Sequence, residues 1–303
     1  MKVSRRAFFK HVKNELEDVS FEDIVHIERA YDFGKNAHTG QVRASGDPYF
    51  EGHCVPVALH VLELGMDRTL ICAALLHDTI EDTDVTVEDI QERFGAEVAL
   101  LVEGVSKLGK LKYRGNERHV ESLRKFFVSV AQDVRVVILK LADRWHNLET
   151  LSYLPDEKQE RIALESIMIH APLASRLGMG KLVTTINDLA FPYAYPEEYE
   201  RTRKLMVARL KKAEGSIKKI YRGMLITVSE SLGYTPKVDK RIKGTYSLYK
   251  KLERKHWNED EIFDLVALRV ITNTVADCYS ALGAVHNHWR PVPGRVKDYI
   301  AVP

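Results

Sequence analysis

The spacing of apolar residues between residue 1 and about residue 195 most constrains the fold of this chain. In this stretch apolar residues recur three and four positions apart, in segments separated by short turns that contain Gly, Pro or Asp. This period places the apolar side chains on one face of an α-helix. The sequence therefore predicts an all-α first domain over residues 1–195.

Several helix boundaries inside this domain can be predicted from capping residues. Asp67 is a good N-cap for a helix that runs through LICAALLHDTIED. The T-x-x-D pattern at Thr86 resembles a capping box, and the helix that it begins should end before Gly95. A further helix is predicted over roughly residues 122–150, with a break near Asp133.

The pattern changes twice after the first domain. Residues 196–235 are strongly basic with apolar residues at helical spacing, which predicts a connecting helix with a solvated face. In the segment 236–303, FDLVALRVI at 263–271 is typical of a buried strand, and GRVKDYIAVP at the end of the chain predicts the start of another strand. We therefore expect a mainly α protein whose last part is an incomplete α/β domain of the nucleotidyltransferase type.

The composition indicates a globular protein of the reducing cytoplasm. The 303 residues are 45% hydrophobic and 29% charged, and the formal net charge of +2 gives no general case for nucleic-acid binding. The three cysteines are far apart and form no C-x-x-C pair, which argues against a zinc ribbon and a disulfide scaffold. No stretch approaches the roughly 18 apolar residues of a membrane span.

The segment HDTIED at residues 77–82 interrupts an apolar run with ionisable groups. Residues four apart share a face of a helix, so His77 should lie beside Glu81 and Asp78 beside Asp82. A neighbouring His and Asp can both ligate a divalent cation, and two further carboxylates near the metal are suited to proton transfer. A calcium loop is disfavoured because Val87 stands where such a loop needs glycine.

A metal site needs more ligands than this segment supplies. Asp143 follows an apolar run in VVILKLADRWHNLET, with Asn147 one helical turn later. The candidate imidazole ligands are His38, His53 and His60. Taken one at a time, each of these histidines, like His146, is more commonly a structural or surface residue than a ligand, and Asp143 has a local alternative partner in Lys140 or Arg144.

The order His53, His77-Asp78 and Asp143 resembles the HD superfamily of metal-dependent phosphohydrolases. GQVRASGDPY, LLHDTIEDTDVT, EGVSKLGKLKY and KLADRWHNLETLSYLP resemble the long RelA/SpoT homologues, which make and degrade the alarmone (p)ppGpp. The resemblance covers nearly the whole chain. It implies an α-helical hydrolase domain with one Mn²⁺ that removes the 3′-pyrophosphate of (p)ppGpp, giving GDP or GTP and pyrophosphate.

The resemblance also assigns residues. It implies His53, His77, Asp78 and Asp143 as metal ligands, Glu81 with Asp82 as the acid/base pair, Arg43 and Ser45 beside the guanine or ribose, Asn147 and Thr150 near the nucleotide, and Lys107, Lys112 and Arg114 as phosphate contacts.

The chain departs from the family pattern at several positions. PYFEGHCV is one residue longer before His53 than the family motif and has Cys54 in place of proline. Ala44 stands where a basic residue is usual, and Glu149 replaces an arginine. Because Ala44 and Glu149 remove positive charge, nucleotide affinity or phosphate preference is expected to differ from that of the family.

The last segment resembles the start of the family's synthetase domain, which moves pyrophosphate from ATP to GDP or GTP with Mg²⁺. The residues implied in nucleotide or Mg²⁺ binding are Arg241, Lys243, Ser247 and Lys251 at a helix entrance, Asp264 before a strand, and Arg295 and Lys297. The family's next motifs would lie after Pro303, so we expect weak binding of ATP or GDP at most and no synthesis by these 303 residues.

Three alternatives remain open at this stage. The chain could be a regulatory nucleotide-binding module with its hydrolase switched off, or a hydrolase of another 3′-phosphorylated nucleotide. An RNA-binding or ribosome-binding module that uses residues 201–222 is the weakest, because that stretch lacks interleaved aromatic residues. The expected partners are (p)ppGpp and, through regions outside these residues, the ribosome.

Overall fold

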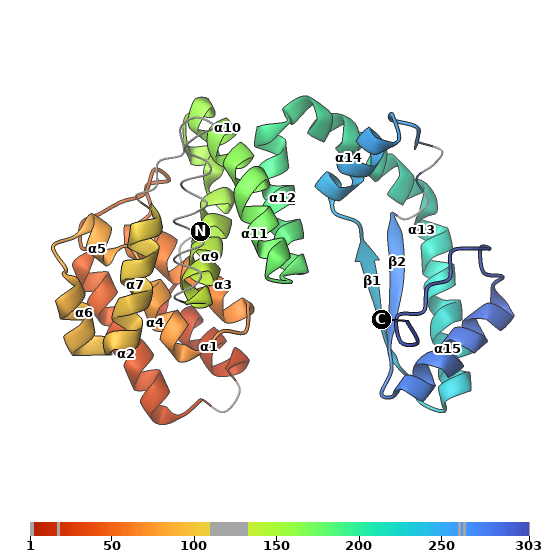
Figure 1. Ribbon diagram of the computed structural model, residues 1–303, viewed down its shortest axis with the longest axis horizontal. Coiled ribbons are helices and arrows are strands. Elements are labelled where there is room, and N and C mark those ends of the chain that lie inside the picture. The colour runs from red at the N-terminus through yellow and green to blue at the C-terminus, as the bar shows by residue number, and fades with distance from the viewer. Residues whose placement is uncertain (1–2, 17–18, 110–132, 260–261, 263–264, 303) are drawn as a thin grey trace. The chain divides into compact units, whose positions relative to one another are not determined.

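The chain folds into two compact units, Met1–Ala194 and Tyr195–Pro303 (Figure 1). The computed structural model describes residues 3–16, 19–109, 133–259, 262 and 265–302. Within these ranges no helix combines the length and the apolar character that a membrane crossing requires. The prediction of a mainly α protein with strands in its last part is confirmed, and the described strands form a two-stranded sheet.

The regular secondary structure in the described residues of the first unit is helical, apart from one isolated bridge between Val42 and Pro48. Its α-helices are α1 (Arg5–Glu15), α2 (Phe21–Ala37), α3 (Val55–Glu63), α4 (Arg68–Leu76), α5 (Thr79–Asp82), α6 (Val87–Phe94), α7 (Ala96–Gly109), α9 (Val134–Glu149), α10 (Asp156–Glu165), α11 (Ala171–Arg176) and α12 (Gly180–Ala194). Shorter turns are the π-helical η1 (Phe50–Cys54), the 3₁₀-helical η2 (Leu151–Tyr153) and the π-helical η3 (Ser166–His170).

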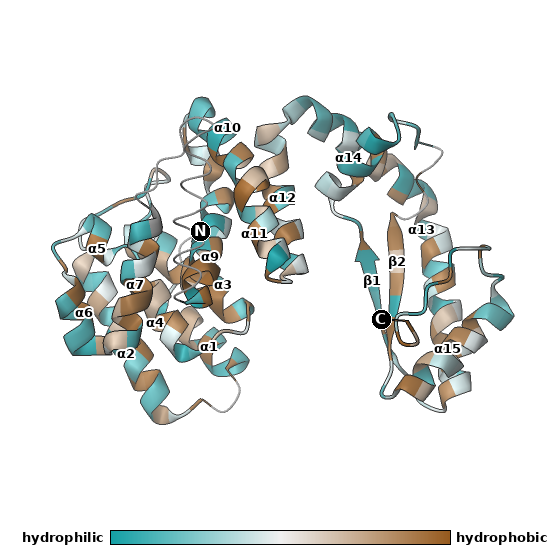
Figure 2. Ribbon diagram, in the orientation of Figure 1, coloured by the Kyte–Doolittle hydropathy of each residue, from teal (hydrophilic) through white to brown (hydrophobic). Residues whose placement is uncertain are grey.

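Helix α4 forms the centre of this unit. All residues from Leu70 to Leu76 are buried, and α4 packs against α2, α3, α7 and α9. Figure 2 shows hydrophobic positions in brown along α3 and α7. Each fully buried leucine contributes on the order of 1.5–3 kcal/mol relative to an exposed one. As predicted, Asp67 caps the helix, accepting a hydrogen bond from Leu70 N at 3.0 Å. The apolar run thus anchors the polar residues that follow it.

The predicted continuation of this helix through Asp82 is wrong, because α4 ends at Leu76 and α5 is a separate turn. Two side chains take the place of backbone donors at the end of α4. His77 Nδ1 donates to Ala74 O at 2.7 Å, and Thr79 Oγ1 donates to Leu76 O at 2.7 Å. Carbonyls bonded in this way no longer need the next helical turn, so His77 and Asp78 lie at a break between helices.

The other predicted boundaries have different outcomes. Thr86 forms the predicted capping box with Asp89, and α6 ends before Gly95 as expected. Asp133 is the N-cap of α9, so the predicted break lies there, whereas the part of that helix predicted over 122–132 lies outside the described residues.

The second unit comprises α13 (Pro196–Leu232), β1 (Lys237–Ile242), α14 (Thr245–Arg254), β2 (Val266–Ile271) and α15 (Val275–His288). β1 and β2 are antiparallel, with Lys237 opposite Ile271 and Ile242 opposite Val266. Leu248 and Leu252 of α14 form a small core with Ile262. The basic stretch predicted as a connecting helix is therefore the long helix of this unit.

Two expectations for the second unit are wrong. β2 is not buried on both faces, because half-buried residues alternate with exposed ones along it. The described residues after α15 contain no strand. There, Asp298 Oδ1 accepts hydrogen bonds from the backbone N–H groups of Ile300 and Ala301, both at 2.9 Å. These local bonds form a turn and compete with strand pairing.

Candidate active site

Two histidines and two aspartates from three separate segments meet in the first unit. His53 Nε2 lies 3.1 Å from Asp78 Oδ2 and 3.4 Å from Asp143 Oδ1. His77 Nε2 lies 3.1 Å from the same Asp78 oxygen. His53, His77 and Asp143 are buried, and one ligand atom from each lies within 4.8 Å of the others. Imidazole nitrogen and carboxylate oxygen together form a ligand set that suits a divalent transition metal.

The hydrogen bonding of the His77 ring is the arrangement expected of a metal ligand. Its Nδ1 donates to the backbone of Ala74, which leaves Nε2 as the free lone pair of the neutral ring. Nε2 is buried and has no hydrogen-bond partner of good geometry among the described residues, although Asp78 Oδ2 lies 3.1 Å away. A bound cation would give this nitrogen the partner that the protein does not supply.

His53 reaches the cluster from the π-helical turn η1. Val55 N–H bonds to Phe50 O, five residues back, so this turn holds one residue more than an α-helical turn. The turn therefore accommodates the extra residue of PYFEGHCV and still directs His53 into the centre. This turn requires glycine at position 52, because a Cβ there would clash with Asp47 Cβ at 2.9 Å.

The two carboxyl groups of the cluster are held in their charged form by positively charged neighbours. Burial alone would raise the pKa of Asp78 and Asp143, but the neighbouring His77 and Lys140, respectively, with help from His53, hold both values well below the ordinary range. Burial alone would lower the pKa of His77, but the Asp78 carboxylate outweighs it and raises the value to about 9. Both carboxylates are thus ionised at neutral pH, and a cation and a proton compete for the same place.

Glu81 and Asp82 lie on the short helix α5, next to the cluster, and both are exposed. Partial burial of the Glu81 carboxyl, together with the charges of Asp78 and Asp82, raises its pKa against the opposing hydrogen bond from Ser106. The backbone carbonyl of Asp82 accepts a hydrogen bond from Gln41 Nε2 at 2.6 Å. A carboxyl with a raised pKa beside a second carboxyl whose backbone is anchored is an arrangement suited to acid/base chemistry.

Three predicted nucleotide-binding residues form a chain that ends on the cluster. Arg43 donates to Asn147 Oδ1 at 3.1 Å and to Thr150 Oγ1 at 3.3 Å. Asn147 Nδ2 donates to Asp143 Oδ1 at 2.6 Å. The guanidinium also lies 5.5 Å from the centre of the Tyr49 ring. The structure therefore fixes the positively charged guanidinium of Arg43 beside the cluster of His and Asp side chains.

The other predicted residues of the first unit are not part of this chain of contacts. Ser45 donates to Asp47 Oδ2 at 3.2 Å in a local turn, and Lys107 is exposed and pairs with Glu103 at 2.7 Å. Lys112 and Arg114 lie outside the described residues.

The two alternative histidine ligands have other partners. His38 lies 2.7 Å from Gln41, and His60 pairs with Glu149 at 3.1 Å.

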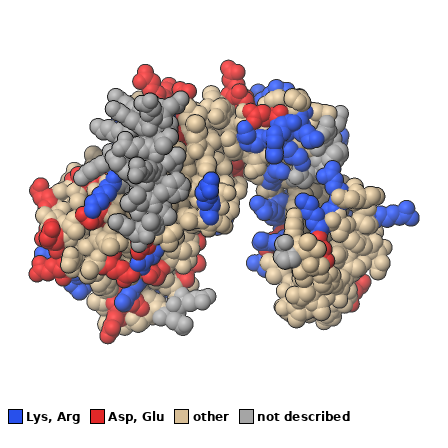
Figure 3. Space-filling model, viewed as in Figure 1, with Lys and Arg blue, Asp and Glu red and all other residues tan. Residues whose placement is uncertain are grey.

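The predicted residues of the second unit lie on several segments. Arg241 is on strand β1 and not at a helix entrance, because the strand extends to Ile242. Ser247 and Lys251 are on α14, Lys243 precedes it, and Arg295 and Lys297 are exposed after α15, while Asp264 lies outside the described residues. Lys and Arg side chains gather around α14 in Figure 3.

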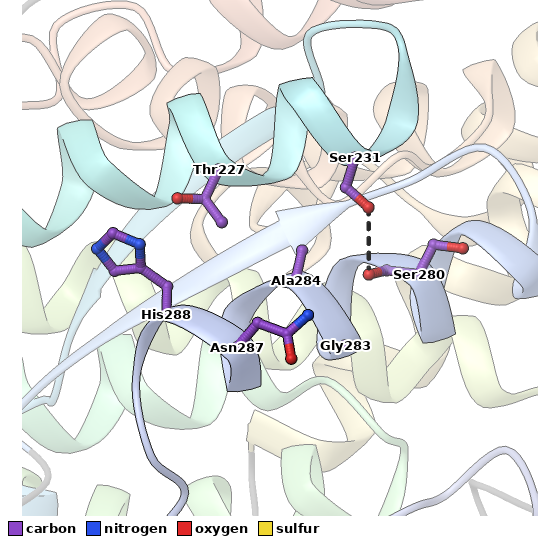
Figure 4. A pocket seen from close by; sticks show the side chains of 7 residues that line it. All are labelled: Thr227, Ser231, Ser280, Gly283, Ala284, Asn287 and His288. Atoms are coloured by element: carbon purple, nitrogen blue, oxygen red, sulfur yellow. Dashed lines mark hydrogen bonds between the residues drawn. The ribbon is translucent and has the colours of Figure 1, made fainter.

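Two pockets lie in the described part of the chain, one in each unit. One of about 550 Å³ lies beside the acid/base turn and is lined by Gln41, Asp82 and Arg93 among others. The other, of about 510 Å³, lies between α13 and α15 and is lined by small and polar residues (Figure 4). Across it, Ser231 Oγ donates to Ser280 O at 3.5 Å. Its lining includes none of the residues that the sequence predicts for nucleotide binding.

Sequence reasoning missed two side chains that touch the cluster. Tyr49 donates its hydroxyl to Asp78 Oδ2 at 2.8 Å, and burial followed by the Asp78 charge raises the pKa of this phenol so that it keeps its proton. His146 Nδ1 lies 2.8 Å from His53 Nδ1, and burial together with the charge of His53 lowers the pKa of His146 to about 2. The available signal was position, since each lies three or four residues from a ligand.

Comparison with known proteins gives matches along most of the chain. A profile of the HD domain matches residues 30–180, and a profile described as a region found in RelA and SpoT proteins matches residues 240–303. The guanosine-3′,5′-bis(diphosphate) 3′-pyrophosphohydrolase of Aquifex aeolicus is 45% identical over 277 residues, 91% of this chain and 39% of that protein.

Two further relatives match over similar ranges. The GTP pyrophosphokinase of Streptomyces coelicolor is 45% identical over 284 residues, 91% of this chain and 32% of that protein. The bifunctional (p)ppGpp synthase/hydrolase SpoT of Escherichia coli is 42% identical over 286 residues, 93% of this chain and 40% of that protein. The chain thus spans between 32% and 40% of the length of these three relatives. With an HD domain in its first unit and the RelA/SpoT region in its second, the chain belongs to the RelA/SpoT family, as its motifs predict.

Proposed function

We propose that the first unit hydrolyses (p)ppGpp at its 3′-pyrophosphate, releasing pyrophosphate and GDP or GTP. The observation that supports this most is the link between Arg43 and Asp143 through Asn147, which joins an anion-binding group to a cluster of metal-ligand type. The Aquifex relative is named for this reaction and the Escherichia relative is named as bifunctional. The choice of (p)ppGpp over other 3′-phosphorylated nucleotides as the substrate is also part of the proposal.

His53, His77, Asp78 and Asp143 are the proposed ligands of the metal. When bound, the metal supplies an acidified water and positive charge for the phosphoryl oxygens. Two imidazoles favour Mn²⁺ or a similar transition ion over Mg²⁺, which prefers oxygen ligands and keeps much of its water. We propose Mn²⁺ because the family resemblance and this mixed ligand set agree.

The protein's own groups divide the proton transfers between them. We assign Asp82 to take the proton from the attacking water, because its turn is anchored by Gln41 at the backbone. We assign Glu81 to deliver a proton to the ribose 3′ oxygen as the bond to phosphorus breaks, because its raised pKa helps it retain that proton. The resemblance places Arg43 beside the guanine or ribose; because Asn147 and Thr150 hold its guanidinium near Asp143, we propose that it also contacts the phosphates.

Replacing Asp82 by Asn tests the proton-transfer role. The Asp82→Asn variant should bind Mn²⁺ like the wild type but lose on the order of 10²–10⁴-fold in kcat, the range for a positioned acid or base. Asp84→Asn is a matched control, because Asp84 is also an exposed acid of the same segment and lies two residues further on. Equal kcat values for the wild type and Asp82→Asn would refute the assignment, as would an equal loss in both variants.

We also propose functions for the remaining segments. Residues 1–195 are the proposed hydrolase, 196–235 the connector and 236–303 the first part of a synthetase that binds ATP and GDP or GTP with Mg²⁺. The RelA/SpoT profile and the Streptomyces pyrophosphokinase support the last assignment. The proposed location of the whole protein is the cytoplasm, and the three thiols, all free, are compatible with it.

The 303 residues themselves are expected to make no (p)ppGpp. Their two described strands form a two-stranded sheet whose residues are in part exposed, which supports an unfinished synthetase site. Incubation with ATP, GDP and Mg²⁺ followed by nucleotide chromatography checks this expectation. Formation of ppGpp would contradict it and leave the hydrolase proposal unaffected.

A further inference from the structure

His146 is a buried histidine whose ring faces the proposed ligand His53. It is 2% exposed, and its Nδ1 lies 2.8 Å from Nδ1 of His53. At that distance one nitrogen must carry the hydrogen and the other must accept it. His146 lies on α9 one helical turn after Asp143, so a ligand and the partner of another ligand come from the same helix.

The position of the metal cluster decides which nitrogen donates. His53 Nε2 faces the Asp78 and Asp143 oxygens at 3.1 and 3.4 Å, on the side where a cation would bind. A nitrogen that ligates a metal has no hydrogen, so the hydrogen of the neutral His53 ring must be on Nδ1. Nδ1 of His53 then donates, and Nδ1 of His146 must accept.

The ring of His146 is held in place by packing between α3 and α9. Trp145 stacks on His60 of α3, with ring centres 3.8 Å apart and planes 9° from parallel. His60 also pairs with Glu149 at 3.1 Å, one turn beyond Trp145. These contacts hold two successive turns of α9 against α3, and His146 lies between them.

His77 shows what is unusual about this arrangement. Its Nδ1 donates to a backbone carbonyl of its own helix, an acceptor that no substitution removes. His53, in contrast, depends on another side chain for its acceptor. We propose that His146 is a positioning residue that fixes the tautomer and ring orientation of His53 for metal binding. The inference rests on the metal centre of the proposed function but not on the identity of the substrate.

Metal affinity tests this role without any turnover. Asparagine and leucine have nearly the same shape, but only asparagine offers an acceptor oxygen close to the position of the histidine Nδ1. We expect His146→Leu to weaken Mn²⁺ binding by about 10–100-fold, the range for loss of such a partner, and His146→Asn to retain most of the affinity. Calorimetric titration of the metal-free, full 303-residue protein with Mn²⁺ alone gives the dissociation constants.

Two controls separate positioning from folding. His11→Leu removes an exposed histidine of α1 and should leave Mn²⁺ binding unchanged. The thermal midpoints of the metal-free proteins show whether each variant folds. If His146→Leu fails to fold, His146→Phe retains a ring without an acceptor and takes its place in the comparison.

Three results would overturn the inference. The first is wild-type affinity in the leucine or phenylalanine variant, and the second is an equal loss in that variant and in His146→Asn. The third is absence of any Mn²⁺ binding by the wild type, which would also reject the metal centre. Wild-type Mn²⁺ binding that the leucine variant loses, without any ppGpp hydrolysis, would reject only the proposed reaction.

Discussion

Charged side chains of α9 pair with side chains of opposite charge. How much each pair contributes to stability depends on its burial. Lys140 Nζ lies 2.8 Å from Asp143 Oδ2, with the Asp143 side chain 6% exposed. Removing one partner of such a buried pair costs about 3–5 kcal/mol, because a charge remains without compensation. Asp133 and Arg135, at the start of the helix, are 2.7 Å apart but more exposed, so solvent screens their attraction.

Replacing Asp133 by Asn gives a pH-dependent change in stability. Hydrogen bonds from Arg135 lower the pKa of Asp133 below its ordinary value, outweighing partial burial. The carboxylate therefore stabilises the fold above the unfolded-state pKa, and this contribution is lost as the pH falls through the lower folded-state value. Asparagine retains the N-cap acceptor, so only the charge is lost.

We expect Asp133→Asn to lower the free energy of unfolding at neutral pH by a few tenths to about 1 kcal/mol, the range for a partly exposed pair. In strongly acidic solution the difference from the wild type should vanish. Denaturant unfolding of both proteins at the two conditions measures it. A difference that is the same at both conditions would mean that the carboxylate charge has no role.

At the scale of the elements, the site depends on a close approach of α2, η1 and α4. A Cβ on Gly34 of α2 would lie 2.6 Å from the Phe50 ring and 2.8 Å from the Leu75 carbonyl oxygen. Phe50 begins the turn that carries His53, and Leu75 lies two residues before His77. The backbone carbonyl cannot rotate away, so the helices themselves would have to separate.

Gly34→Ala should therefore destabilise the first unit by about 1–3 kcal/mol, as overpacking does in other cores. Gly180 of α12 has nothing within 4 Å of its added Cβ, so Gly180→Ala is a control that should be neutral or slightly stabilising. Thermal unfolding followed by circular dichroism compares the two variants with the wild type. An unchanged midpoint in Gly34→Ala would show that α2 can move away without loss.

Local patterns predicted where helices begin more reliably than where they end. Asp67 and Thr86 cap helices as predicted, and Asp133, where only a break was predicted, also caps one, because these side chains bond to backbone N–H groups a few residues away. The break after Leu76 depends on side-chain bonds to backbone carbonyls, which apolar periodicity does not reveal. The π-helical turn that contains His53 likewise follows from one extra residue whose accommodation depends on the surrounding packing.

At the scale of the whole molecule, the sequence predicts the structure of the first unit better than that of the second. In the first, His53, His77 and Asp143 meet, since the segments that carry them pack around one core. The partners Tyr49 and His146 could not be assigned, because each contact depends on ring orientations fixed only by tertiary packing. In the second unit, sheet burial was overestimated, because apolar composition alone does not say how many strands pair.

The Escherichia coli relative is named as a bifunctional synthase/hydrolase, and the hydrolase proposed for this chain lies in its first unit. A regulatory module with its hydrolase switched off would bind (p)ppGpp without turnover. A hydrolase of another 3′-phosphorylated nucleotide would turn over that compound in preference to ppGpp. Both alternatives can therefore be distinguished from the proposed hydrolase by measuring turnover with and without metal and with different nucleotides.

Release of pyrophosphate from ppGpp by the metal-stripped protein, before and after addition of Mn²⁺, is the most direct measurement. GDP, which has no 3′-phosphate, serves as the control substrate. The account predicts negligible release without metal, restoration by Mn²⁺ but much less by Mg²⁺, and no pyrophosphate from GDP. Absence of Mn²⁺-dependent release from ppGpp, or equal release in the presence of excess chelator, would contradict it.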